Sequence, residues 1–266
     1  LTSAAYRFQA RPFDLKSTTT SCDHCAGGCE IRADHRHHQV KRHQAGDAPE
    51  VNEEWLCDKG RFGFVSGRGE DRLTRPLVRR NGVLQVASWP EAIDAAVAGL
   101  KAAGTAVGVL PGGRLTVENA YAYSRFARTV LGTNNIDFRS RAASEEEAEF
   151  LASRVAGRGM DVTYADLEAA KHVVLVSYEP EDETSVVFLR LRKAVRKHGL
   201  KVTTLAPFAS RGTQKLSATL IPVAPGAEAQ TLEAMELEEG TIILVGERAA
   251  CQPGLLSAVS AKAVLS

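Results

Sequence analysis

Residues 22–29 read Cys-Asp-His-Cys-Ala-Gly-Gly-Cys, and a fourth cysteine, Cys57, follows after a gap of 27 residues. Three thiols within eight residues converge on one point only where the backbone wraps around a bound group. Thiolates are soft ligands, and four of them suit either a tetrahedral zinc ion or a [4Fe–4S] cluster. The stretch therefore predicts a small metal-stabilised domain at the start of the chain, held by Cys22, Cys25, Cys29 and Cys57.

Two other uses of these cysteines compete with an iron–sulfur cluster. Disulfide staples belong to small secreted domains, whereas this chain has 266 residues, can bury an ample core, and carries an odd number of cysteines, five. Zinc ribbons usually present two C-x2-C pairs. Here a group of three cysteines is followed by one distant cysteine, which departs from that pattern. Nearby histidines are further zinc ligands by type: His24, His35, His37, His38 and His43. The simpler interpretation places them on a solvated turn, and chemistry alone favours iron–sulfur over zinc by a small margin.

The composition is that of an ordinary globular protein. Hydrophobic residues make up 44% of the chain and charged residues 24%, and 33 basic against 32 acidic residues give a net charge of +1. This balance gives no reason to expect nucleic acid or an anionic membrane surface as a partner. No apolar run approaches the roughly 20 residues of a membrane span, so we expect no direct membrane insertion. Unpaired cysteines fit a reducing cytosol.

The pattern along the chain changes near residue 80. Residues 1–80 are rich in turn formers, charges and cysteines, and predict a small, irregular or β-rich cluster domain. Residues 81–266 alternate between apolar runs and helical periodicity, which predicts βαβ units and a doubly wound, mostly parallel α/β domain. The expected strands are 105–110, 172–177, 201–205, 219–223 and 241–245, and the expected helices are 117–131 and 184–198.

Three motifs, taken in order, resemble the molybdopterin oxidoreductase superfamily. The first is the four-cysteine spacing followed by Lys59-Gly60, and the second is residues 72–79, Arg-Leu-Thr-Arg-Pro-Leu-Val-Arg. The third is residues 88–92, Ser-Trp-Pro-Glu-Ala, where the family typically starts a helix. The similarity continues through residues 132–137 and Pro225-Gly226. The resemblance implies a [4Fe–4S] cluster on the four cysteines and the α/β scaffold of that superfamily.

Within the superfamily, the chain looks most like the large iron–sulfur subunits of bacterial NADH–quinone oxidoreductase, respiratory complex I. Residues 11–15, 47–55 and 188–199 carry this likeness. It implies an electron-transfer subunit whose partners are the other peripheral-arm subunits, at the cytoplasmic face of the plasma membrane. The flavin and quinone sites would lie on those partners. Because the chain opens at Leu1 and stops at Ser266 in mid-pattern, we expect an internal piece of a longer subunit, with a truncated α/β domain and no turnover of its own.

Three positions depart from the catalytic members of the superfamily. The position of the metal-ligating cysteine, two residues after Arg141, is Ala143, and the next residue is Ser144 rather than histidine. Residues 177–183 read Ser-Tyr-Glu-Pro-Glu-Asp-Glu in place of a Gly-x-Asn-Pro turn, and their acids would repel a pyrophosphate. Ala206 replaces an aspartate that would accept from ribose hydroxyls. These losses imply that no molybdopterin is bound; a catalytic enzyme of the formate dehydrogenase or nitrate reductase kind and a zinc-stapled module remain alternatives.

Two further residues carry expectations. Lys59, two residues after the fourth cysteine, is expected to offset the negative charge of the cluster or to pair with a neighbour. Cys251 stands alone before Gln252-Pro253-Gly254 and is expected to be a structural thiol near a helix start.

Overall fold

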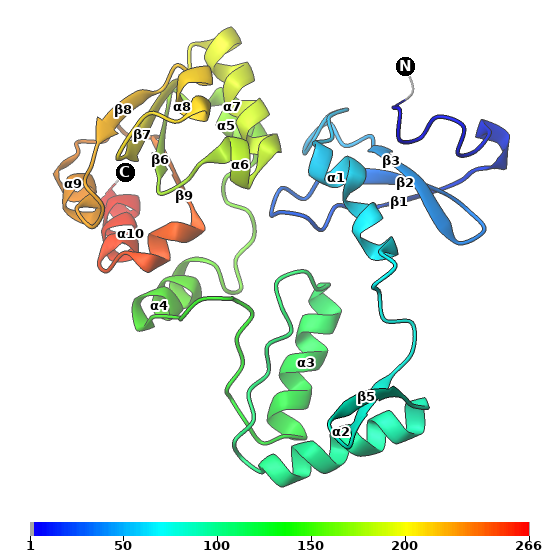
Figure 1. Cartoon of the computed structure of the whole chain (residues 1–266). Coiled ribbons are helices and arrows are strands. Elements are labelled where there is room, and N and C mark those ends of the chain that lie inside the picture. Colours follow the sequence, from blue (N-terminus) through cyan, green and yellow to red (C-terminus); the bar gives the residue numbers. More distant parts are fainter. Residues whose placement is uncertain (1–2, 266) are drawn as a thin grey trace. The chain divides into compact units, whose positions relative to one another are not determined.

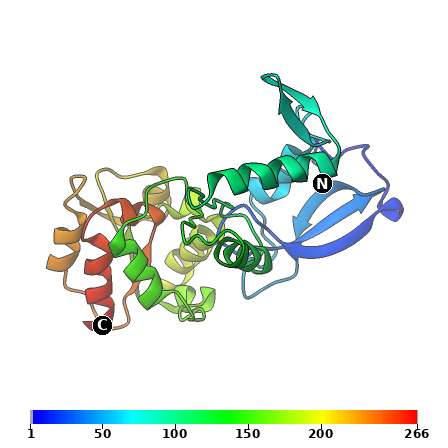
Figure 2. The ribbon, with the colours of Figure 1, turned by 90° about the horizontal axis from the view of Figure 1, so that it is seen from below.

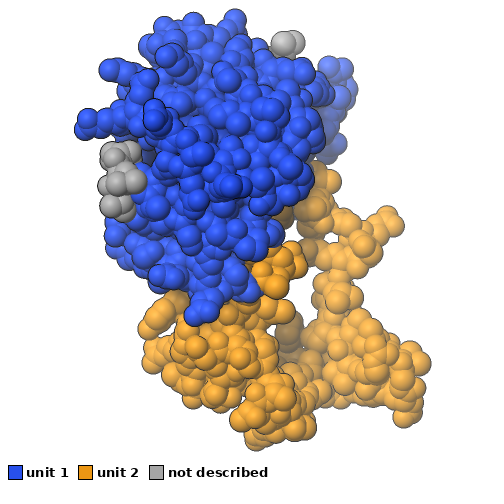
Figure 3. Space-filling model, turned by 90° about the vertical axis from the view of Figure 1, so that its left-hand side faces the viewer, with its two compact units in different colours: residues 1–64, 143–266 blue, residues 65–142 orange. Residues whose placement is uncertain are grey.

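The structure is a computed structural model that describes residues 3–265. Leu1, Thr2 and Ser266 lie outside the described residues. They are the first two residues and the last residue of the predicted domains 1–80 and 81–266. The chain forms two compact units, one of residues 1–64 with 143–266 and one of residues 65–142 (Figure 3). The N-terminal cysteines and the C-terminal α/β part therefore belong to the same unit.

The strands are β1 (Lys16–Ser21), β2 (Glu30–Arg36), β3 (Gln39–Ala45), β4 (Leu77–Arg80), β5 (Val83–Val86), β6 (His172–Val176), β7 (Lys201–Ala206), β8 (Thr219–Pro222) and β9 (Ile242–Val245). The α-helices are α1 (Asp58–Phe62), α2 (Trp89–Ala103), α3 (Val117–Thr129), α4 (Glu145–Arg154), α5 (Tyr164–Ala169), α6 (Pro180–Glu183), α7 (Ser185–His198), α8 (Arg211–Lys215), α9 (Glu228–Ala234) and α10 (Leu255–Leu265). Three short 3₁₀ helices are η1 (Pro12–Asp14), η2 (Gly63–Arg68) and η3 (Glu247–Cys251).

The N-terminal strands form an antiparallel sheet in the order β1-β2-β3. Asp34 on β2 is buried, only 1% exposed, and its carboxylate accepts from Ser17 Oγ at 2.6 Å and Arg42 Nε at 2.6 Å. One buried carboxylate thus joins all three strands. This small sheet confirms the β-rich start that the sequence predicts.

The second sheet has the order β8-β7-β6-β9, with every neighbouring pair parallel. Residues 173–176 read Val-Val-Leu-Val and are buried on both faces, as the central strand of a parallel sheet requires. Helices cover both sides of the sheet (Figures 1 and 2). The doubly wound α/β part predicted from the sequence is thereby confirmed.

Alternate residues of β6 feed two separate cores. Val173 and Leu175 pack with α5 and α7, while Val174 and Val176 pack with α9 and α10. Cys29 and Val51, from the N-terminal region, pack against the first of these cores. The core on the α5–α7 side therefore extends to the cysteines.

Helix α7 begins and ends close to the predicted residues. Gly199 follows it with φ 71°, and its N–H donates to the carbonyl of Ala194, the left-handed ending for which glycine is suited. The acidic residues before the helix form the short helix α6, and its last turn is basic. The charges complement the helix dipole.

In the unit of residues 65–142, a β4–β5 hairpin turns at Asn81-Gly82, both with positive φ, and leads to α2. Ser88 and Glu91 cap α2 reciprocally. The predicted strand 105–110 is reduced to one parallel bridge between Val109 and Ile136. Helix α3, expected over 117–131, is found at Val117–Thr129, and Ala127 is its buried residue.

Candidate functional site: a four-cysteine centre and a sheet-edge cavity

Three of the four cysteines lie in the loop of the β1–β2 hairpin. Register places Ser21 opposite Glu30, so Cys22 and Cys29 are the first residues beyond the paired strands. The Cys22 N–H donates to the carbonyl of Cys29 at 2.8 Å and closes the loop, with Cys25 at its tip. Gly28 has φ 67°, a left-handed conformation that glycine adopts at little cost.

The segment that carries Cys57 is brought to this loop by Asn52, whose side chain is 1% exposed. Its Oδ1 accepts from the Glu30 N–H at 2.9 Å, and its Nδ2 donates to the carbonyls of Glu30 at 3.1 Å and Trp55 at 2.9 Å. Cys57 then stands at the N-cap position of α1. Because Glu30 follows Cys29 directly, the amide of Asn52 connects the two cysteine segments.

Electrostatics show that the four sulfurs share one neighbourhood. Burial, together with the neighbouring charges of Cys25, Cys22 and Cys57, raises the pKa of Cys29 to about 11. Burial likewise raises the pKa of Cys22, with Cys25 and Cys57 contributing in the same direction. These shifts favour the neutral thiols, and a bound metal ion inverts that preference because it deprotonates a coordinating thiol.

The residues present fit a group held by soft ligands. A Cβ on Gly27 would lie 2.9 Å from Val186 Cγ1 and 3.4 Å from Cys25 Sγ, and one on Gly60 would lie 2.6 Å from Leu56 Cδ1 and 3.2 Å from Cys22 Sγ, so glycine lets the backbone pack closely against the sulfurs. Within residues 3–265, no group of three or more His, Cys, Asp or Glu side chains is arranged to hold a single metal ion. By their chemistry, four thiolates suit either a tetrahedral zinc ion or a [4Fe–4S] cluster.

The nearby histidines have other neighbours. His43 Nδ1 lies 2.9 Å from the carbonyl of Gly60, and its ring packs against Phe64. The ring of His24 fills the space beside Gly63. His37 and His38 form the exposed β2–β3 turn, as the sequence indicates, and His35 Nε2 lies 3.3 Å from Thr18 Oγ1.

Lys59 is exposed on α1, and its Nζ donates to the backbone carbonyl of Asp182 at 3.0 Å. The ammonium group therefore connects the cysteine region to α6. Its role in offsetting cluster charge stays a prediction. Cys251 is exposed at the end of η3, a few residues before α10.

Sequence reasoning missed two buried residues that join the cysteine segments to the α/β part. Tyr164, at the start of α5, donates its hydroxyl to the carbonyl of Gly27 at 2.7 Å. Arg190, on α7 and 6% exposed, donates to the carbonyls of Val51 at 2.8 Å and Pro49 at 2.5 Å.

Arg190 also carries one signal visible in the sequence. It lies on the apolar stripe of α7, between Val187 and Leu191, where a buried arginine needs partners. Glu168 supplies one, at 2.7 Å from Arg190 Nη1. Burial would raise the pKa of Glu168, but hydrogen bonds from Arg190 and Lys193 outweigh it and lower that pKa.

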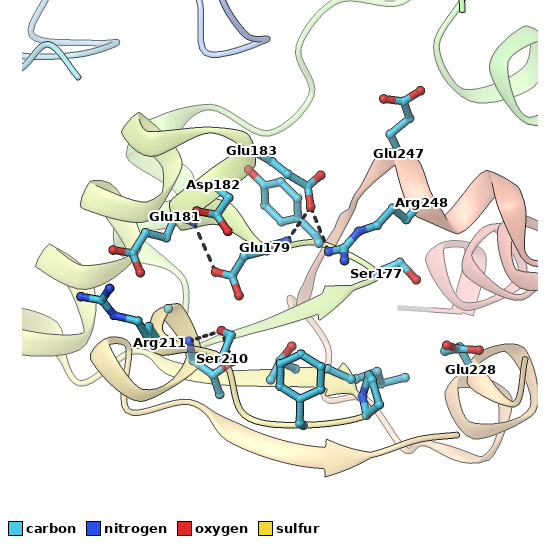
Figure 4. Close-up of a pocket in the computed structure, with 18 of the residues that line it drawn as sticks. Ser177, Glu179, Glu181, Asp182, Glu183, Ser210, Arg211, Glu228, Glu247 and Arg248 are labelled. Carbon is cyan, nitrogen blue, oxygen red and sulfur yellow. Dashed lines mark hydrogen bonds and ion pairs between the residues drawn. The ribbon is translucent and has the colours of Figure 1, made fainter. Parts of the chain in front are cut away.

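A cavity of about 760 Å³ opens at the carboxyl ends of the parallel strands (Figure 4). It lies where the strand order reverses, between β6 and β9, the usual ligand position in such sheets. The two strands approach closely here, since a Cβ on Gly246 would lie 2.2 Å from the carbonyl oxygen of Ser177. Ser177 itself has φ 49°, a left-handed conformation that favours glycine.

The cavity wall is acidic. Its lining residues include two guanidinium groups, Arg211 and Arg248, and six carboxylates: Glu179, Glu181, Asp182, Glu183, Glu228 and Glu247 (Figure 4). Several of these carboxylates are held within the wall: Glu183 accepts from the Glu179 N–H at 2.8 Å and from Arg248 at 3.1 Å. Glu179 occupies the space in front of Gly212, where a Cβ would lie 2.1 Å from its Oε1.

The other departures from the catalytic pattern have plain structural places. Ser144 caps α4 by accepting from the Glu147 N–H at 3.1 Å. Ala143 immediately precedes it and is exposed. Ala206 ends β7 on the cavity wall. Tyr178 also lines the cavity, and burial raises its pKa to about 12, with smaller contributions from Glu183, Tyr164 and Cys25.

The chain is similar to known proteins over nearly all of its length. It is 54% identical to the G subunit of the NADH-quinone oxidoreductase of Streptomyces coelicolor, over 99% of this chain and 35% of the relative. It is 53% identical to the protein of the same name from Mycobacterium bovis, over 98% of this chain and 34% of the relative. The chain thus spans about a third of the length of these curated relatives.

The fold is shared with solved structures. The acetylene hydratase of Pelobacter acetylenicus matches with a TM-score of 0.57 at 16% identity, over 82% of this chain and 31% of that one. The Molybdopterin oxidoreductase Fe4S4 domain matches residues 15–66, which include all four cysteines of the centre. The Molybdopterin oxidoreductase family itself matches residues 72–249, and the chain therefore belongs to that family.

Proposed function

We propose that this chain is an electron-transfer part of an NADH–quinone oxidoreductase, carrying one [4Fe–4S] cluster on Cys22, Cys25, Cys29 and Cys57. The observation that carries the proposal is the attachment of the Cys57 segment to the three-cysteine loop by the Asn52 side chain, within the residues that match the Fe4S4 domain. A [4Fe–4S] cluster takes up and gives back single electrons at a potential set by its surroundings. The chain's own residues hold the thiols in place, shield them on the side of α5 and α7, and place Lys59 beside α6.

The cavity at the sheet edge is proposed to hold no molybdopterin. Its acidic excess is the supporting observation, because like charges in a partly enclosed site repel a pyrophosphate by several kcal/mol at an effective dielectric constant of about 20. Ala143 offers no metal ligand where the catalytic pattern has one.

The proposed setting is the peripheral arm of respiratory complex I, on the cytoplasmic side of the plasma membrane, with the other peripheral-arm subunits as partners. None of the helices within residues 3–265 combines the length and apolar character that a membrane crossing requires. We assign residues 1–80 to the cluster domain and residues 81–266 to the α/β scaffold. Turnover belongs to the whole complex, and these 266 residues have no activity of their own.

The test is an anaerobic visible spectrum with iron, sulfide, zinc and molybdenum measured on the same sample. We expect a broad brown absorbance, about four iron atoms and four sulfides per chain of these 266 residues, and no molybdenum. Cys57→Ser should lose the iron, whereas Cys251→Ser, a matched change at an exposed thiol outside the centre, should keep it.

Each alternative has its own outcome. One zinc and no colour, even after anaerobic reconstitution with iron and sulfide, would overturn the electron-transfer proposal in favour of a structural module. Stoichiometric molybdenum would favour a catalytic oxidoreductase and would assign the sheet-edge cavity to its cofactor.

A further inference from the structure

Both cysteine segments are anchored on one pair of helices. The loop of residues 22–29 is tied to α5 by the hydroxyl of Tyr164, and the segment that leads to Cys57 is tied to α7 by Arg190. The two anchors touch, since the guanidinium carbon of Arg190 lies 5.8 Å from the centre of the Tyr164 ring. The helix pair α5–α7 therefore acts as a common base for the proposed ligands.

We propose that Tyr164 is a positioning residue that fixes the three-cysteine loop and raises the reduction potential of the cluster. This inference rests on the proposed function. It assigns to one phenolic hydroxyl, far from the cysteines in sequence, a measurable part in the electron affinity of the centre.

The position of Tyr164 is itself firmly set. Its side chain is 9% exposed. It follows Thr163, which caps α5 reciprocally with Asp166: Thr163 N–H donates to Asp166 Oδ2 at 2.8 Å, and the Asp166 N–H donates to Thr163 Oγ1 at 3.2 Å. Because the Tyr164 side chain is held in place by its helix, its hydroxyl fixes the position of the carbonyl that accepts the hydrogen bond.

The acceptor has little freedom either. Gly27 is buried, and a Cβ there would lie 2.9 Å from Val186 Cγ1 and 3.4 Å from both Thr184 Cγ2 and Cys25 Sγ. The loop therefore sits directly on the start of α7. A trans peptide is planar, so fixing the Gly27 carbonyl also fixes the direction of the Gly28 N–H between Cys25 and Cys29.

The direction of the effect follows from charge. The Tyr164 hydroxyl donates to the carbonyl of Gly27, which lies two residues after Cys25 and two residues before Cys29. Reduction adds a negative charge to the cluster. The O–H dipole compensates the partial negative charge on the Gly27 oxygen, and this favours the reduced state. Without the hydroxyl, the carbonyl is buried and unpaired.

The experiment is a redox titration of Tyr164→Phe in the complete subunit, followed by electron paramagnetic resonance. Difference spectra against a Cys22→Ser/Cys25→Ser variant isolate this cluster. We expect Tyr164→Phe to keep its iron while its equilibrium constant for one-electron reduction falls several-fold, a tenfold fall being ~59 mV. Hydrogen exchange across residues 22–29 should rise.

Tyr6→Phe is the matched control. Tyr6 is also buried, at 8% exposed, donates its hydroxyl to a backbone carbonyl, that of Ala10, and carries the guanidinium of Arg42 over its ring at 4.5 Å. Tyr6→Phe removes the same hydroxyl oxygen as Tyr164→Phe, but Tyr6 has no hydrogen bond to the cysteine loop. The reduction potential of the cluster in Tyr6→Phe should equal that in the unaltered protein.

A second variant separates electrostatics from simple loss of fit. 3-Fluorotyrosine at position 164 keeps the hydroxyl and makes it a stronger donor, so the potential should shift upward, opposite to Tyr164→Phe. Potentials equal to that of Tyr6→Phe in both variants would overturn the proposal. The absence of any cluster signal in the unaltered protein would instead refute the proposed function itself.

Discussion

Glu168, a partly buried residue of α5, shows how much depends on single charges between α5 and α7. Its carboxylate is within 3.0 Å of both Arg190 and Lys193, and Lys193 also pairs with Glu53 at 2.6 Å. Leaving a buried arginine without its carboxylate lowers the free energy of unfolding by several kcal/mol. We therefore expect the loss of any one of these four charged side chains to weaken the interactions of the others. The pairs connect α5 and α7 to the segment before Cys57.

This network predicts a particular dependence of stability on pH. Arg190 and Lys193 lower the folded-state pKa of Glu168 below its ordinary 4.5, so its stabilising contribution is present above that value and is lost as the pH falls through the folded pKa. The free energy of unfolding of the native protein should therefore exceed that of Glu168→Gln at pH 7, and the gap should narrow below about pH 4.5. Urea unfolding of both proteins from pH 7 to pH 3 measures this, and a constant gap would contradict it.

At the scale of elements, the tight point is the contact between β6 and β9. The Gly246 N–H donates to the carbonyl of Val176 at 3.0 Å, at the edge of the sheet where the strand order reverses and the cavity opens. We expect Gly246→Ala to destabilise the protein by about 1–3 kcal/mol, because its methyl group would overlap the Ser177 carbonyl. Thermal or urea unfolding gives the value.

Gly99→Ala is the control for that prediction. Gly99 lies inside α2 with nothing within 4 Å of an added Cβ, so alanine there should stabilise by roughly 0.5–1 kcal/mol. The free energy of unfolding should thus fall for Gly246→Ala and rise for Gly99→Ala. Equal changes in the two variants would show that backbone entropy, rather than the β6–β9 contact, determines the effect of Gly246→Ala.

Elements with local signals could be predicted from the sequence, and those that depend on distant partners could not. The strand at residues 172–176 and the Ser88 cap of α2 appear as expected, because β-branched runs and capping pairs act over a few residues. Residues 105–110 have the same apolar character but form only one bridge, since pairing depends on what lies alongside. The spacing of the cysteines predicts the centre, whereas the carbonyl that Tyr164 binds is 137 residues away along the chain.

For the molecule as a whole, the centre and the parallel sheet should respond differently to metal removal. Binding of a cluster stabilises the segments that carry its cysteine ligands. The parallel sheet is stabilised by two hydrophobic cores of its own, so it can stay folded when those segments open. Chelation of iron should raise hydrogen exchange across residues 22–29 and 57–62 while β6, β7 and β9 stay protected. A uniform rise over both regions would show that the cluster holds the entire unit together.

The bond between Tyr164 and Gly27 has a consequence for how the protein is made. Ribosomes add about 5–20 residues per second, so the 137 residues between donor and acceptor take roughly 7–30 s to synthesise. During that interval the three thiols of the loop have been synthesised, but the helices that shield them have not. Cofactor delivery and oxidative damage then compete for the same open cysteines on the nascent chain, and translation speed over residues 30–164 sets the length of that competition.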